Sequence, residues 1–327
     1  LVPMVAVEVW RHAAHIAADR RREVDKPVPV LALKLISVAL FGHHVLAPED
    51  EHALVMAVRA VEDELADDMF RVLPLTPWAA FARTKRRAVA RSAMSIVVQH
   101  VRAKAAETSV LKNLETLGLD GESIRDEVLT MLLAGHHTTG SAVAWVLYHM
   151  ATEPGLADAL ALEAAEISNS AGELQPERVK SATLSLTLAR EVLRLYPSSW
   201  WYSREVRRKI ELGGRVLKPG TSLLISPWQI HRDPRYWSNP NQFRLDRSYT
   251  GRAYIPFGAG PRACVGMGVA LLELQLIALE IASAYTLDNA AVAPAPEPRA
   301  SLTLLPPTIS IDFQPRERAV ASQYSAA

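Results

Sequence analysis

Apolar residues recur at intervals of three and four along most of the first two-thirds of the chain, as on one face of a helix. The runs end at glycine or proline, residues that cap or interrupt helices, at Gly42, Pro74 and Pro197. Besides one longer helix, this pattern predicts helices over residues 31–41, 49–72, 81–107, 156–167 and 177–196.

The longest apolar stretch has no Asp, Glu, Lys or Arg between Val128 and Met150. Ser123 and Asp126 form a Ser-x-x-Asp signal that predicts a capped start, and Pro154 ends the helix after about residue 152. The stretch is long enough to cross a bilayer. Polar residues in its middle favour instead a helix buried in the core of a large domain.

The last third of the chain has a different character. Short runs between Trp201 and Ile225, separated by Gly-Gly and Pro-Gly turns, predict a small sheet. Residues 227–254 predict an ordered coil, and residues 265–285 an apolar helix. We expect a final hairpin to contain Leu302, Leu304, Ile309 and Ile311.

The composition of the 327 residues, 49% hydrophobic and 22% charged, is that of a globular protein. With no internal repeat, it predicts one mainly α domain with small β-sheets over residues 1–327. A net charge of +1, with no basic stretch interleaved with aromatics, argues against a nucleic-acid partner. The single cysteine excludes an intrachain disulfide and fits a reducing compartment, so we expect a cytoplasmic protein without a membrane anchor.

That cysteine lies in the segment Phe257-Gly-Ala-Gly-Pro-Arg-Ala-Cys264-Val-Gly266, directly before the last apolar helix. A helix N-terminus stabilises a thiolate, the form of cysteine that binds metal. Gly258 and Gly260 allow a tight loop to approach a flat group, and Gly266 has no side chain to collide with one. Taken alone, a single cysteine is more often a small buried hydrophobe.

The complete Phe-x-x-Gly-x-Arg-x-Cys-x-Gly pattern resembles the signature loop of cytochromes P450. The resemblance implies a b-type haem whose iron is held by Cys264 as a thiolate, a ligand that favours O–O cleavage. It implies that Arg262 pairs with a haem propionate. It also implies that Phe257 packs beside the sulfur, and that Gly258 and Gly266 lie against the cofactor.

Glu191 and Arg194 are one turn apart on a predicted helix. The ordinary meaning of such a pair is a surface ion pair of little energetic value. The P450 resemblance implies instead a structural network with Arg247, which would hold the coil on the cysteine side. The chain departs from the family pattern at Leu245, where proline is usual.

The middle of the longest helix reads Ala134-Gly-His-His-Thr-Thr139, and a Thr hydroxyl here can bond to a carbonyl one turn earlier and open a kink. The resemblance implies that Thr138 helps to deliver protons, that Gly135 lies over the haem and that Ala134 lines the substrate site. His137 stands where the family usually has an acid, and histidine can relay protons near neutral pH. The alternative is a buried helix whose polar residues are satisfied.

The segment after the Glu191 helix resembles a further part of the family pattern. Arg204 matches an arginine that pairs with a haem propionate, a strong charge-assisted contact. Ser199, Trp200 and Trp201 fall where substrate-lining residues are found. The alternative is the start of a strand with packed tryptophans.

The resemblance extends from about Leu1 to Pro315 and implies a P450 fold that lacks the family's N-terminal sheet and first helices. It implies a monomeric monooxygenase acting with O2 on a small apolar substrate. No flavin or nicotinamide fingerprint is present, so electrons are expected from a ferredoxin or flavodoxin with its reductase. Two alternatives remain: a non-catalytic haem-binding remnant and a peroxide-driven oxygenase.

Overall fold

A computed structural model describes most of the chain from Arg21 to Arg316. The helix predicted over residues 49–72 lies mostly outside the described part, as do the last residues of the one predicted over 81–107. The described residues are 9, 21–23, 27–42, 55–57, 64, 67–68, 71, 76–102, 109–170, 172–175, 177–288 and 297–316.

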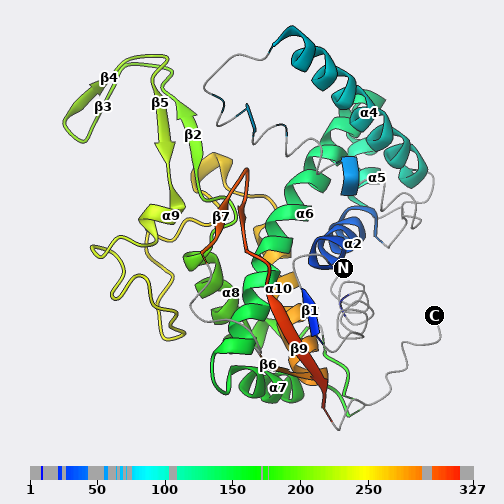
Figure 1. Cartoon of the computed structure of the whole chain (residues 1–327), viewed down its shortest axis with the longest axis vertical. Coiled ribbons are helices and arrows are strands. Elements are labelled where there is room, and N and C mark those ends of the chain that lie inside the picture. The colour runs from blue at the N-terminus through cyan, green and yellow to red at the C-terminus, as the bar shows by residue number, and fades with distance from the viewer. Residues whose placement is uncertain are drawn as a thin grey trace.

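The long helix α6 (Gly121–Thr152) runs through the middle of the molecule, and other helices pack along it (Figure 1). α2 (Pro27–Phe41) lies against its first half. Three helices surround its second half: α7 (Leu156–Ile167), α8 (Thr183–Leu195) and α10 (Met267–Ala284). Other α-helices with described bounds are α4 (Pro77–Arg102), α5 (Val110–Thr116) and the single turn α9 (Pro227–Ile230).

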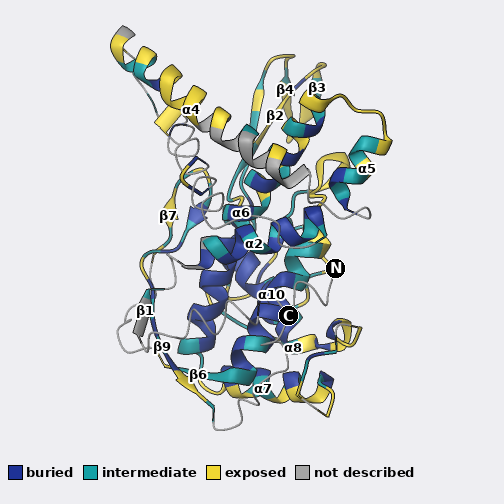
Figure 2. Cartoon of the chain, turned by 90° about the vertical axis from the view of Figure 1, so that its right-hand side faces the viewer, coloured by how far each residue is buried: buried dark blue, intermediate teal, exposed yellow. Residues whose placement is uncertain are grey.

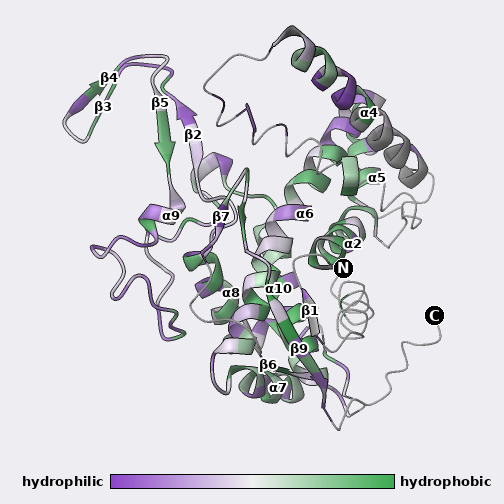
Figure 3. Cartoon of the chain, viewed as in Figure 1, coloured by the Kyte–Doolittle hydropathy of each residue, from purple (hydrophilic) through white to green (hydrophobic). Residues whose placement is uncertain are grey.

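Two clusters of buried apolar side chains hold these helices together. The larger cluster joins the second half of α6 to α7, α8 and α10, and contains Trp145 stacked on Tyr196 with 3.7 Å between ring centroids. The smaller cluster joins α2, α5 and the first half of α6 around Phe41 and Leu132. Figure 2 shows the buried residues concentrated on α2, α6 and α10, and Figure 3 shows how apolar α2 and α7 are. Removal of this apolar surface from water stabilises the fold.

The start of α6 differs from the predicted one. The N-cap is Asp120, whose carboxylate accepts a 2.7 Å hydrogen bond from the Ser123 amide. The predicted cap at Ser123 is therefore wrong by one turn. A carboxylate at the N-cap satisfies a free helical N–H group and lies favourably at the positive end of the helix dipole.

The sheets are small. β1 (Arg21–Glu23) and β6 (Tyr285–Asp288) both pair with the central strand β9 (Ser310–Pro315). The described residues also form three two-stranded sheets: β2 (Tyr202–Glu205) with β5 (Ser222–Ile225), β3 (Ile210–Leu212) with β4 (Arg215–Leu217), and β7 (Arg299–Ala300) with β8 (Leu304–Leu305).

The predicted final hairpin is wrong, because the segments around Leu304 and Ile311 do not pair with each other. Leu304 pairs with Ala300, whereas Ile311 in β9 pairs with Arg22 of β1. β9 buries Ile311 and Phe313 in the main core, and this burial fixes its register against strands distant in the sequence.

The architecture is mainly α with small β-sheets, as the sequence predicts. Among the described residues, one helix, α10, has the length and composition needed to cross a membrane. Half of that helix is buried in this fold, against α6, α7 and α8, as is usual for the core helix of a globular domain.

Candidate active site

Cys264 lies in an exposed loop that leads into α10. Its amide donates a 2.9 Å hydrogen bond to the carbonyl of Phe257, which closes the loop. Gly258 and Gly260 have φ values of +70° and +73°, a conformation that favours glycine. The Phe257 side chain packs against the main core, so the loop is anchored on one side while its thiol faces outward.

Gly266, the N-cap of α10, lies beside the sulfur. A Cβ atom added to Gly266 would stand 3.8 Å from Sγ of Cys264. This is an ordinary van der Waals distance, so Gly266 borders the sulfur closely. The lack of a side chain there suits a planar group bound at the sulfur.

Two arginines that resemble propionate partners are exposed. Arg204 on β2 donates to its neighbour's carbonyl, at Ser203, and its guanidinium lies 4.9 Å from the Tyr202 ring. Neither Arg204 nor Arg262 forms an ion pair with a carboxylate of the described residues. Both cations are therefore available to a carboxylated ligand.

Gly135 contributes to helix packing. A Cβ atom placed there would come within 2.8 Å of Cδ1 and Cγ1 of Ile36 on α2. The absent side chain thus faces α2, which gives a packing reason for the glycine. The role of Gly135 over a haem stays a prediction.

The polar residues that follow Gly135 lie on an uninterrupted helix. The Thr138 hydroxyl donates a 2.6 Å hydrogen bond to the Ala134 carbonyl, one turn earlier. His136 is buried, His137 is half-buried, and their rings meet edge to face at 4.6 Å. Ala134 is exposed. The threonine back-bond is present as expected, but α6 continues through it as a regular helix.

Ser198 connects this part of α6 to the last described segment of the chain. The buried Ser198 hydroxyl donates to the Thr138 carbonyl at 2.7 Å, and the Ser198 carbonyl accepts from the Leu304 amide at 2.9 Å. Ser141 in turn donates to the Leu304 carbonyl. The backbone at Thr138 is therefore held by residues more than 50 positions away.

Glu273 is a residue that sequence reasoning missed. It lies on α10, nine residues after Cys264, and is 3% exposed. Burial raises its pKa to about 8, although a hydrogen bond from Thr139 of α6 acts in the opposite direction. A buried carboxyl group beside Thr139 can thus hold a proton near neutral pH. Its only sequence signal is that it is one of two acidic residues, with Glu280, in a largely apolar helix.

Glu191 is fully buried and forms the centre of a polar cluster. Arg194 binds both of its carboxylate oxygens, at 2.8 and 2.9 Å, and Arg247 donates to Oε1 at 3.0 Å. The Tyr249 hydroxyl donates to Oε2 at 3.0 Å. Burial and the Glu191 charge raise the pKa of Tyr249. The structure therefore brings Glu191, Arg194 and Arg247 together.

The same two arginines hold the coil that follows α9. Arg194 donates to the carbonyls of His231 and Pro240, and both arginines donate to that of Gln242. A buried ion pair that also satisfies backbone carbonyls fixes this irregular segment in place.

The three predicted substrate-lining residues beyond α8 differ in their surroundings. Ser199 is exposed. The Trp200 indole donates a 2.9 Å hydrogen bond to the Ser301 carbonyl and packs against the main core. Trp201 meets the Trp200 ring edge to face at 6.1 Å. Trp200 therefore has a packing role, while the substrate role of all three stays a prediction.

The donor set of the cysteine loop fits a haem. Cys264 is exposed, Gly266 lies beside its sulfur, and Arg204 and Arg262 are exposed cations suited to two propionates. No cluster of three or more His, Cys, Asp or Glu side chains elsewhere in the described part of the chain could hold a metal ion.

A family model for cytochrome P450 matches residues 5–313. Cyclooctatin synthase from Streptomyces melanosporofaciens is 36% identical over 176 residues, which cover 51% of this chain and 38% of that protein. Putative cytochrome P450 132 from Mycobacterium tuberculosis (strain ATCC 25618 / H37Rv) is 34% identical over 211 residues, 61% of this chain and 45% of that protein. Cytochrome P450 4V2 from Homo sapiens is 38% identical over 168 residues, 49% of this chain and 32% of that protein.

The aligned part covers less than half of the length of each of these relatives. The match of the family model over residues 5–313, together with the cysteine loop and the Glu191 cluster, shows that the chain belongs to the cytochrome P450 family.

Proposed function

We propose that the chain supplies the haem-thiolate centre of a monooxygenase that inserts one oxygen atom from O2 into a small apolar substrate. The observation that carries this proposal is the outward-facing thiol of Cys264, held at the start of α10. A haem b bound through that thiolate would supply dioxygen activation.

Several side chains have roles in this proposal. Cys264 binds the iron, with Phe257, Gly258 and Gly266 beside it, while Arg262 and Arg204 neutralise the propionates. Thr138 and His137 pass protons along α6, and the carboxyl of Glu273, with its pKa near 8, can hold one beside Thr139. Ala134, Ser199, Trp200 and Trp201 face the substrate.

Electrons are proposed to come from a ferredoxin or flavodoxin with its reductase, because the sequence has no fingerprint for a flavin or nicotinamide. The protein is proposed to act as a cytoplasmic monomer. The near-neutral net charge and single cysteine support that location.

The test is the carbon monoxide difference spectrum of the reduced, haem-loaded protein. We expect a strongly red-shifted Soret band, and a Cys264→Ser variant that lacks it. A wild-type band without the shift would overturn the proposal. Equal turnover with peroxide and with a reductase system would retain the thiolate and favour a peroxide-driven oxygenase. Haem binding without turnover under either condition would favour a non-catalytic protein.

A further inference from the structure

His231 is buried, and both nitrogens of its ring are engaged. Nδ1 lies 3.1 Å from the carbonyl oxygen of Arg194, and the amide of Ile255 donates to Nε2 at 2.9 Å. Since an amide can only donate, Nε2 has no hydrogen and Nδ1–H is the donor to Arg194. The contacts therefore select one neutral tautomer. Burial lowers the pKa of His231 to about 4, which is consistent with a neutral ring.

The imidazole stands between two parts of the molecule that have separate roles. On one side is Arg194, whose guanidinium also donates to the His231 carbonyl at 2.8 Å, so the two residues hold each other. On the other side is Ile255, two residues before Phe257. The Glu191 cluster holds the coil between residues 238 and 247 through its carbonyls. The imidazole of His231 connects the Arg194 carbonyl to the Ile255 amide through its two ring nitrogens.

Ile255 is coupled to the cysteine loop by short hydrogen bonds. Its carbonyl accepts from the Gly258 amide at 3.0 Å, and the Phe257 carbonyl accepts from the Cys264 amide at 2.9 Å. The residue between Ile255 and Phe257 is the buried Pro256, whose ring restricts φ. A shift of Ile255 is therefore passed to Phe257 and to the backbone of Cys264.

The ring also has a stacked neighbour on this path. Tyr254 lies over it with 5.7 Å between ring centroids and 23° between planes, and the Tyr254 hydroxyl donates to the Arg190 carbonyl. Tyr254 fixes the plane of the imidazole, but it does not replace the acceptor at Nε2.

We propose that His231 is a positioning residue for Cys264: its Nε2 atom sets the Ile255 amide relative to α8, and this sets the loop that presents the thiol. The inference rests on the proposed function, because it assigns His231 to the thiolate site.

Two substitutions separate the two ring nitrogens. In His231→Gln the side-chain amide reaches about as far as Nε2 and keeps an acceptor for Ile255. In His231→Asn the amide lies near the place of Nδ1 and keeps a donor to Arg194, but leaves the Ile255 amide unpaired. An Asp120→Ala variant, changed at the far N-cap of α6, is the control for general destabilisation.

The first readout is the share of the red-shifted Soret band in the reduced, carbon monoxide-bound protein. We expect wild type, His231→Gln and Asp120→Ala to keep it. In His231→Asn the ratio of shifted to unshifted band should fall roughly fivefold, the equivalent of about 1 kcal/mol for one hydrogen bond. Equal loss in the Gln and Asn variants, or none in Asn, would overturn the positioning role.

The second readout does not depend on haem. Cys264 is the only cysteine, so a thiol reagent reports on this loop alone. We expect the reaction rate of the haem-free protein to change several-fold in His231→Asn and to stay at the wild-type value in His231→Gln and Asp120→Ala. If wild type shows no red-shifted band, the proposed function fails, and the thiol rates still decide the role of His231. Equal rates in all four proteins would then overturn it.

Discussion

Glu191 accepts hydrogen bonds from Arg194, Arg247, Tyr249 and the Arg244 amide while its side chain is fully buried. A carboxylate removed from water in this way is stable only because its partners replace the solvent. Neither Glu191 nor Arg194 can therefore be neutralised alone without leaving the other charge buried and uncompensated.

We therefore expect Glu191→Gln to lower the free energy of unfolding by about 3–5 kcal/mol, since it breaks a buried pair from one side. Urea denaturation measures the change. Asp246→Asn is the control, because the Asp246–Arg244 pair is exposed and should contribute little. Similar losses in the two variants would contradict a special cost of burial at Glu191.

Glu273 makes stability depend on pH with the opposite sign to an ordinary ion-paired carboxylate. Its folded-state pKa, about 8, is above the ordinary value of 4.5, so folding favours the protonated form. Its contribution to stability is present below about pH 4.5 and is lost as the pH rises from there to about 8.

The Glu273→Gln variant imitates the protonated carboxyl. It should match the wild-type stability at about pH 3.5 and exceed it at about pH 8.5 by a few kcal/mol, because each pKa unit corresponds to about 1.4 kcal/mol. Urea midpoints at the two pH values test this. Glu166→Gln, on the exposed face of α7, should show no such divergence. A constant difference between wild type and Glu273→Gln at both pH values would contradict the assignment.

Single residues could be predicted from the sequence where their signal is local. The cysteine loop is a contiguous pattern, and Glu191 and Arg194 share one helical turn, so both could be identified. The hydrogen bonds that join Ser198 to Thr138 and Glu273 to Thr139 could not be predicted, because the partners lie 60 and 134 positions apart along the chain. Only the packing of α6 against other segments brings such pairs together.

At the scale of elements, the contact of α2 with α6 is set by the fit of Ile36 against Gly135. In Gly135→Ala, overpacking should lower the free energy of unfolding by about 1–3 kcal/mol. The higher helix propensity of alanine should offset roughly 1 kcal/mol of this loss. Thermal unfolding should be measured for Gly135→Ala, Ile36→Ala and the double variant. The double variant should lose less stability than the sum of the two single losses, because alanine at position 36 makes room for the new Cβ at position 135. Additive effects would contradict the contact.

The start of α6 provides a second prediction at this scale. Asp120→Ala should cost about 1 kcal/mol of stability, because it removes the N-cap acceptor. Ser123→Ala should cost little, since Ser123 contributes its backbone amide to the cap. Urea denaturation of both variants decides between them, and a larger loss in Ser123→Ala would restore the cap predicted from the sequence.

The ends of a helix could be predicted from the hydrophobic pattern where residues in or beside that helix determine where it stops. α2 ends at Phe41 before Gly42, and α7 spans the predicted residues 156–167. The final hairpin failed for the opposite reason, since the partners of β9 are strands remote in the sequence. Periodicity predicts that a strand has a buried face, but not which strand lies beside it.

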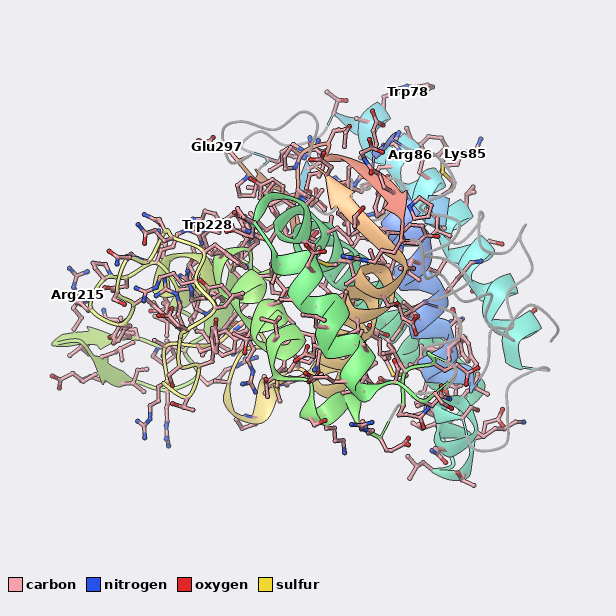
Figure 4. The ribbon with its side chains drawn as sticks, turned by 90° about the horizontal axis from the view of Figure 1, so that it is seen from below. Trp78, Lys85, Arg86, Arg215, Trp228 and Glu297 are labelled. Carbon is pink, nitrogen blue, oxygen red and sulfur yellow. The ribbon has the colours of Figure 1, made fainter. Side chains whose placement is uncertain are left out.

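At the scale of the whole molecule, stability resides in the helical core and not in the hairpin formed by β3 and β4. This hairpin projects from the body in Figure 1, and Figure 4 shows Arg215 at its outer end. Leu212 and Val216 on it are more than half exposed. Its Gly213-Gly214 turn has positive φ at both positions, as a two-residue hairpin turn requires.

Replacement of residues 208–218 by Asn-Gly should therefore change the free energy of unfolding by no more than about 0.5 kcal/mol, the usual range for exposed sites. The bonds between Val206 and residues 220–221 lie outside the replaced segment and would close the shortened turn. In a urea titration, we expect the dependence of the free energy of unfolding on urea concentration to keep the wild-type slope. A loss of several kcal/mol would mean that the hairpin supports the core.

The pairing of β1 with β9 has a consequence for how the protein is made. Arg21 is in register with Asp312, so the two strands are separated by almost 300 residues of chain. At about 5–20 residues per second, a ribosome needs roughly 15–60 s to synthesise that interval. Until then β1 cannot pair with β9, and Ser141 of α6 and Ser198 cannot form their hydrogen bonds with Leu304. The β1–β9 pair and the contacts of Leu304 are therefore among the last parts of the described structure that can form during synthesis.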